Sequence, residues 1–219
     1  MSGRAVGRKV VARAIVHTGR SWMGRRWIGA SAMTFALLLA ATLGAGSASA
    51  AVSMCNMPIP MSDGTVLRAN VYLPASTGHY PTVLTATGYN KDAGNPTGQN
   101  CEGGFQGIAG DEPSLTEKGF AVMVIDDRGT GASGGKWESW GQRTQDDYKE
   151  VLDWIQAQQW SSGSVATTGE SYMGITSLLI AEADAARVAE GKPRAVQAVW
   201  ADIPMADAYR DVTFQGGAV

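Results

Sequence analysis

One serine of this sequence has neighbours that could make it a nucleophile. Ser171 lies in the segment ATTGESYMGIT, residues 166–176, between Gly169 and Gly174 and with apolar residues on both sides. A serine in a sharp turn between a strand and a helix can expose its hydroxyl for acyl transfer. The usual elbow pattern, Gly-x-Ser-x-Gly, would place glycine at Met173 instead. The motif alone therefore leaves a structural turn serine open as the alternative.

The elements that would position Ser171 can be predicted from the residues around it. A short strand, SVATTG, ends near Thr168, and a helix begins near Tyr172 and stops before Gly191 and Pro193. The apolar stripe predicted for this helix contains Ile175, Leu178, Leu179, Ala183 and Ala186. The amino end of such a helix points its N–H groups at the place where an oxyanion would form.

The remaining segments predict an α/β fold with a parallel sheet and crossover helices. Residues 59–74 form a hairpin with its turn at Asp63-Gly64, and residues 82–86, 120–125 and 194–204 form strands. Residues 90–112 are predicted to be a long loop. Residues 143–160 form a helix that Thr144 caps, with Asp147 completing a capping box. Its apolar stripe contains Tyr148, Val151, Leu152 and Ile155.

The first 50 residues predict an export signal. They hold seven basic residues and no acidic one, followed by the apolar run WIGASAMTFALLLAATLGAG. Small residues end the run, and Ala48-Ser49-Ala50 fits a signal peptidase site. The alternative is a transmembrane anchor, although the apolar core is short and rich in Gly, Ala and Ser. We therefore predict a secreted, extracellular protein that is cleaved after Ala50 and keeps no stable membrane anchor. A twin-arginine signal is only weakly matched.

Composition limits what the rest of the chain, residues 51–219, can do. These 169 residues hold all 20 acidic but only 11 basic residues, a formal net charge of −9, which argues against nucleic acid as a partner. Cys55 and Cys101 are predicted to form a disulfide after export, with two buried thiols as the alternative. A single histidine, His79, and the lack of Cys-x-x-Cys predict no metal site, and nothing in the sequence predicts a cofactor.

Four segments, in order, resemble the X-Pro dipeptidyl-peptidase and cocaine esterase family of serine hydrolases. They are MSDGTVLRANVYLP at residues 61–74, GYNK at 88–91, DDRGTGASGG at 126–135 and the segment 146–174. The elbow of that family reads G-x-S-Y-x-G, so Met173 is no departure from it. The resemblance spans roughly residues 59–215. It implies an α/β-hydrolase fold, present here from its first strands through the elbow to the following strand.

The resemblance also implies roles for three residues. Ser171 would be the nucleophile that forms an acyl-enzyme. The backbone N–H of Tyr172 and the hydroxyl of Tyr89 would be the two oxyanion donors, with a surface loop tyrosine as the alternative reading of Tyr89. The substrate would be a small-molecule ester or a short peptide, possessing an ester or amide bond to cleave.

Other polar and aromatic residues near these segments are predicted to be structural. Asp126, Asp127 and Arg128 follow a strand, where a turn with an ion pair is expected. Glu170 is expected to support the turn without reacting. Trp137 and Trp140 are expected to pack, with a place at the substrate entrance as the alternative.

The base and the acid of a serine hydrolase are missing after Ser171. In an α/β-hydrolase they follow the serine in the order Asp, His, and no histidine lies beyond Ser171. His79 lies far upstream, and Asp202, Asp207 and Asp211 come too soon after the next strand. We therefore expect this chain to be the front part of a longer enzyme. The alternative is an inactive, truncated chain with at most a binding or accessory role.

Overall fold

The computed structural model describes a single mixed α/β unit within the part of the chain after the predicted leader. The described residues are 51–93, 101, 106–107, 110–205, 207 and 209–214. The leader, residues 1–50, and much of the predicted loop at 90–112 lie outside them. Among the described helices, none is long and apolar enough to cross a membrane.

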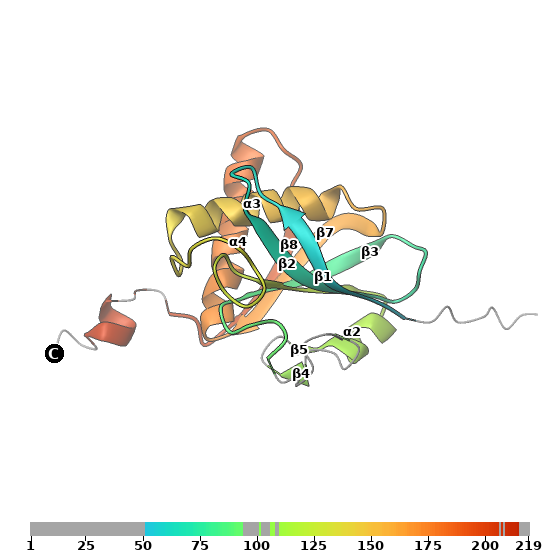
Figure 1. Cartoon of the computed structure of the whole chain (residues 1–219), viewed down its shortest axis with the longest axis horizontal. Helices are drawn as coiled ribbons and strands as arrows, with labels where there is room; N and C mark the ends of the chain where they lie inside the picture. Colours follow the sequence, from blue (N-terminus) through green and yellow to red (C-terminus); the bar gives the residue numbers. More distant parts are fainter. Residues whose placement is uncertain are drawn as a thin grey trace, which may run out of the picture. The chain divides into compact units, whose positions relative to one another are not determined.

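The main sheet has six strands in the order β1-β2-β6-β3-β7-β8 (Figure 1). The neighbours β6, β3, β7 and β8 are parallel, whereas β1, β2 and β6 pair antiparallel. This arrangement confirms the predicted α/β class, with an antiparallel hairpin added at one edge. The strands are β1 Val52–Pro60, β2 Val66–Leu73, β3 Tyr80–Thr87, β6 Ala121–Asp126, β7 Ser161–Glu170 and β8 Val196–Asp202.

The hairpin of β1 and β2 turns at Asp63-Gly64, as predicted. The Met61 N–H donates to the Thr65 carbonyl at 2.8 Å, and Gly64 has φ +84°, which glycine adopts without strain. A β-bulge interrupts β1 between Met54 and Met57.

The disulfide joins Cys55, inside the bulge of β1, to Cys101. Their Cα atoms lie 5.5 Å apart, across a sequence separation of 46 residues. Cys101 is buried together with Tyr72 and Val122. The bridge therefore fastens the segment around residue 101 to the sheet.

Helices cover the sheet on both faces (Figure 1). The helices α3, Gln142–Gln156, and α4, Tyr172–Ala189, pack on each other and on the sheet over the larger core. The short helix α2, Glu112–Glu117, packs against β6 and β2 and adds Leu115 to a smaller core. Two-residue strands β4, Gln106–Gly107, and β5, Gly110–Asp111, pair beside it, and a π-helix, η2, spans Tyr209–Thr213.

The start of α3 differs from the prediction. The helix begins at Gln142 with Gly141 as its N-cap, and the structure gives it no side-chain cap hydrogen bond. Thr144 is instead a buried residue inside the first turn, and its hydroxyl has no partner among the described residues. Asp147 accepts hydrogen bonds from Arg128 rather than completing a capping box. The predicted apolar stripe of α3 is buried, as expected.

Replacing Thr144 with valine is expected to stabilise the protein. Valine has nearly the same shape and a similar helix propensity, and it removes a buried hydroxyl without a partner, a group that costs about 1–3 kcal/mol. We expect a gain of about 1 kcal/mol in the free energy of urea unfolding. Thr144→Ser, which keeps the hydroxyl, is the matched control, and a gain of the same size in that variant would contradict this account.

The buried face of α4 also differs from the prediction. Leu178, expected in the core, is 43% exposed, while Ile180 and Met173 are buried. Polar residues share the buried face because the fold gives them partners: Asp184 accepts the Val196 N–H at 2.8 Å. The full buried set is Tyr172, Met173, Gly174, Thr176, Ser177, Ile180, Ala183, Asp184 and Arg187. An apolar stripe alone could not reveal this face.

Candidate active site

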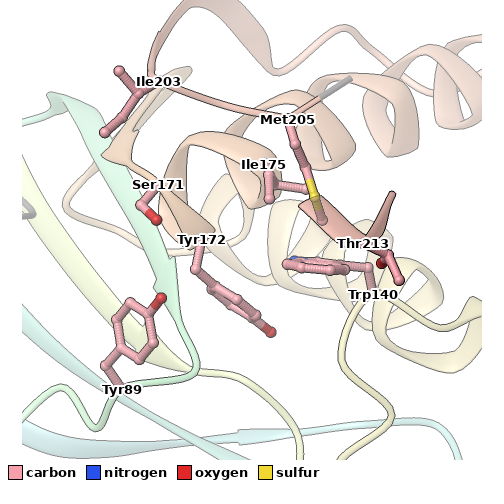
Figure 2. A pocket seen from close by; sticks show the side chains of 8 residues that line it. All are labelled: Tyr89, Trp140, Ser171, Tyr172, Ile175, Ile203, Met205 and Thr213. Carbon is pink, nitrogen blue, oxygen red and sulfur yellow. The ribbon is translucent and has the colours of Figure 1, made fainter. Parts of the chain in front are cut away.

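Ser171 lies between the carboxyl end of β7 and the first residue of α4. Its backbone has φ 56° and ψ −118°, a conformation that costs a non-glycine residue on the order of 1–3 kcal/mol. The Ser171 N–H donates to the Asp202 carbonyl at the end of β8, at 3.0 Å. Figure 2 shows the serine side chain directed into a pocket. The fold therefore holds this residue in a strained turn that exposes its hydroxyl.

The turn around Ser171 is too crowded for side chains at its two glycines. A Cβ atom on Gly169 would lie 2.2 Å from the Met173 Cβ, and one on Gly174 would lie 2.6 Å from the Asp202 carbonyl oxygen. Real Cβ atoms essentially never approach so closely. The glycines singled out in the sequence are thus required by the close approach of β7, α4 and β8.

Aromatic rings form one wall of the pocket. The Tyr172 ring lies between Tyr89 and Trp140, with ring centroids 5.4 Å and 5.1 Å away (Figure 2). Tyr89, on the loop after β3, is 51% exposed. Trp140 therefore lines the pocket rather than only packing, and its buried indole N–H has no partner among the described residues.

The pocket has a volume of about 370 Å³ and no charged side chain in its described lining. It is partly open to solvent, because Tyr89 and Ile203 are exposed. The lining residues are Tyr89, Trp140, Ser171, Tyr172, Ile175, Ile203, Met205 and Thr213. An uncharged pocket of this size suits a small acyl or alcohol group.

Asp127 lies beneath this wall and accepts two tyrosine hydroxyls. Tyr172 donates to its Oδ2 at 2.8 Å and Tyr148 to its Oδ1 at 3.0 Å. Burial raises the pKa of Asp127 to about 6, even though both hydrogen bonds favour the carboxylate; the charges of Asp126 and Asp147 add to the rise. Burial and the Asp127 charge in turn raise the pKa of Tyr172.

The raised pKa of Asp127 predicts a loss of stability as pH rises. Its folded-state pKa of about 6 exceeds the usual 3.8, so the folded chain binds this proton more tightly than the unfolded chain. The resulting stabilisation is complete below about pH 4 and lost as pH rises through 6, by up to about 3 kcal/mol at 1.4 kcal/mol per unit. Asp127→Asn should lack this decrease in urea unfolding measured from pH 4.5 to 7.5.

The difference in unfolding free energy between the parent protein and Asp127→Asn, followed across pH, isolates the titration of Asp127 from that of the other carboxyls. Burial also raises the pKa of Asp126, but Asp126 titrates in both proteins. Glu182→Gln, on the exposed side of α4, is the control and should follow the parent protein. Parallel curves for the parent and Asp127→Asn would contradict the assignment.

Arg128 makes the buried ion pair that the sequence predicted for this turn. Its Nε and Nη2 donate to the two carboxylate oxygens of Asp147 at 2.7 Å and 2.6 Å, and its Nη1 lies 2.8 Å from Asp63. Asp126 accepts the backbone N–H groups of Lys91 and Ala132. These contacts fix the loop after β6, which places Trp140 and Asp127 beside α4.

The described residues bring no histidine to Ser171. His79 precedes the first residue of β3, whereas Ser171 follows the last residue of the neighbouring parallel strand β7. Eight strand residues at about 3.3 Å each separate these two ends by about 25 Å. Asp207 and Asp211 are exposed around η2, and Glu170 is exposed beside the serine. No cluster of three or more metal-binding side chains occurs in the described part of the chain.

A mixed sheet in this strand order, with a strained serine between β7 and a helix, defines an α/β-hydrolase. Solved structures agree: a CocE/NonD family hydrolase from Staphylococcus aureus superposes with a TM-score of 0.63 at 27% identity, over 76% of this chain and 30% of that one. This chain belongs to the X-Pro dipeptidyl-peptidase (S15) family, whose model matches residues 63–219.

Two relatives of this chain are named as esterases. The chain is 30% identical over 177 residues to a Mycobacterium bovis protein named as a serine esterase. The match covers 73% of this chain and 26% of the relative. The chain is also 30% identical over 126 residues to the cocaine esterase of a Rhodococcus species, over 55% of this chain and 20% of that enzyme. This chain therefore spans about a quarter of the length of the mycobacterial relative.

Proposed function

We propose that this chain carries the nucleophile and the oxyanion site of a serine hydrolase that cleaves ester or amide bonds. The observation that carries the proposal is the strained backbone of Ser171 at the carboxyl end of β7. Strain of this kind is retained only where the surrounding structure enforces it, and it clusters at active sites. The place of Ser171 in a pocket next to the amino end of a long helix supports the same role.

The oxyanion donors of the proposal are the backbone N–H of Tyr172 and the hydroxyl of Tyr89. Tyr172 is the first residue of α4, so its N–H is one of the groups that no helical carbonyl accepts. Tyr89 lies across the pocket from Ser171, and its hydroxyl points toward the serine (Figure 2). Two neutral donors would stabilise the developing oxyanion without adding charge to the site.

The reaction would proceed in two steps through an acyl-serine. The Ser171 Oγ attacks the substrate carbonyl carbon, the bond to the alcohol or amine breaks, and a base moves the serine proton to the leaving group. Water then attacks the acyl-serine, releases the acid and returns the proton to Ser171. We propose that the base and its acid partner come from residues beyond these 219, since the described histidine, His79, lies at the opposite end of the sheet from Ser171.

The substrates that fit this site best are small neutral esters. The described lining is uncharged, so it offers no carboxylate to bind the free amino terminus of an X-Pro peptide. The proposal therefore favours faster turnover of p-nitrophenyl butyrate than of glycyl-proline p-nitroanilide. The reverse preference would support the peptidase specificity in the name of the family.

We also propose that the protein is exported and loses residues 1–50. The leader pattern supports this, and so does the Cys55–Cys101 disulfide, since such bonds persist in oxidising compartments. The intact mass of the protein secreted by its native source tests the cleavage and the length together. Cleavage is supported by an amino terminus at Ala51, and a retained leader would contradict it.

Labelling with a fluorophosphonate tests the nucleophile. The protein from its native source should be labelled at Ser171, and Ser171→Ala should abolish both labelling and hydrolysis. The 219-residue chain alone should label slowly, because its serine lacks a base. No labelling of the native protein at Ser171 would favour the rival function, a non-catalytic binding or accessory protein.

A further inference from the structure

Tyr172 is held at its two ends by different parts of the fold. Its backbone forms the first residue of α4, next to Ser171, and its hydroxyl donates to Asp127 at 2.8 Å. Between these ends its ring lies against Tyr89 and Trp140 in the pocket wall. The position of the Tyr172 ring and backbone therefore depends on what holds its hydroxyl.

The group that holds the hydroxyl is itself fixed. Asp127 directly follows β6, is only 2% exposed, and donates its backbone N–H to the Thr87 carbonyl at the end of β3. Its second carboxylate oxygen accepts the Tyr148 hydroxyl from α3. One buried carboxylate thus ties β6, α3 and α4 together beneath the pocket.

We propose that Asp127 is a positioning residue for the hydrolytic reaction, holding the first turn of α4 in place through the Tyr172 hydroxyl. The inference rests on the proposed function, because it concerns the placement of the proposed oxyanion donor. Ser171 needs such support, since its positive φ would relax if the adjoining turn could shift. A displacement of about 1 Å at a reacting group can lower a rate by about a hundredfold.

The mildest test is Tyr172→Phe in the full-length protein, which removes the hydroxyl and keeps the ring and the backbone N–H. With p-nitrophenyl butyrate we expect kcat to fall by about tenfold or more while KM changes by less than about threefold. Asp127→Ala should lower kcat by a similar factor. The double variant should be no slower than the slower single variant, because both changes break the same hydrogen bond between Tyr172 and Asp127.

Two further variants separate positioning from general loss of structure. Asp127→Asn keeps an oxygen that can accept the Tyr172 hydroxyl, and should restore most of the kcat lost in Asp127→Ala. Tyr80→Phe removes a tyrosine hydroxyl at the remote end of β3, where it donates to the Thr77 carbonyl, and should leave kcat near the parent value. If Asp127→Ala does not fold, Tyr172→Phe and Asp127→Asn still decide the question.

Several results would overturn the inference without touching the proposed function. These are an unchanged kcat in Tyr172→Phe, losses that multiply in the double variant, or a kcat in Asp127→Asn as low as in Asp127→Ala. Ser171→Ala, assayed alongside, reports on the proposed function itself. If Ser171→Ala still hydrolyses the ester, the proposed function is overturned. If Ser171→Ala is inactive and any of the three results above is observed, only the role of Asp127 is overturned.

Discussion

Asp147→Asn is expected to destabilise the protein by about 3–5 kcal/mol, the usual cost of removing one partner of a buried ion pair. Asp147 is 1% exposed and accepts two hydrogen bonds from Arg128 and two from Arg143. The variant removes the carboxylate charge, which leaves the partly exposed Asp63 as the remaining charged partner of the buried Arg128 guanidinium. The measurement is the free energy of urea unfolding at neutral pH.

A neighbouring carboxylate on the same helix gives the matched control. Asp146 is partly exposed, and its Oδ1 lies 3.8 Å from the Lys149 Nζ. Asp146→Asn should therefore change the free energy of unfolding by less than about 1 kcal/mol. The combination of Asp147→Leu with Arg128→Met should recover part of the loss, because it leaves no unpaired buried charge. Equal effects of Asp146→Asn and Asp147→Asn would show that the buried pair is not what stabilises this turn.

Loss of the Cys55–Cys101 disulfide is expected to cost about 4 kcal/mol. In the chain-entropy model, a bridge between residues 46 apart restricts the unfolded chain by this amount. The double variant Cys55→Ser with Cys101→Ser should therefore unfold at a lower urea concentration than the oxidised parent. The steepness of its transition should increase as the unfolded chain expands.

Reduction of the parent protein provides the control for this second prediction. The reduced parent and the double serine variant should be equally unstable, and added reductant should leave the variant unchanged. Titration of the native, unreduced protein should find no free thiol. Two reactive thiols in that sample, or equal stability with and without reductant, would contradict the bridge.

The elements best predicted from the sequence are those whose apolar pattern reports their burial. The run predicted at residues 120–125 corresponds to β6, Ala121–Asp126, which is buried on both faces, and the α3 stripe from Tyr148 to Ile155 faces the core. The hairpin turn at Asp63-Gly64 was also predictable, because few residues suit that turn. In each case the local sequence alone determines the structure.

The elements predicted poorly are those in which distant residues satisfy buried polar groups. Arg187 lies on the buried face of α4 because Asp153 and Asp184 accept its hydrogen bonds. Periodicity counts such residues as exposed, so the predicted stripe was only partly right: Ala183 is buried, whereas Leu178 is exposed. The helix α2 is six residues long, too short to show a helical period.

The candidate site was predictable only in part. The sequence named Ser171, Tyr172 and Tyr89, and the structure gathers all three around one pocket. The sequence did not reveal that Asp127 accepts the Tyr172 hydroxyl, because the two residues are 45 positions apart and meet through the packing of separate elements. The adjacent pair Asp126-Asp127 at a strand end was the signal available, and it indicated only a structural turn.

The two edges of the main sheet differ in how closely an added strand would approach Ser171. At one edge, β1 is irregular and bulged, and it lies four strands from β7, about 19 Å at the usual spacing. At the other edge, β8 adjoins β7 directly and leaves Trp200 72% exposed. A parallel strand added beyond β8 would bring its following loop to the same rim as Ser171. New side chains can therefore reach the serine by extension of the sheet at β8, and extension at β1 would leave them remote.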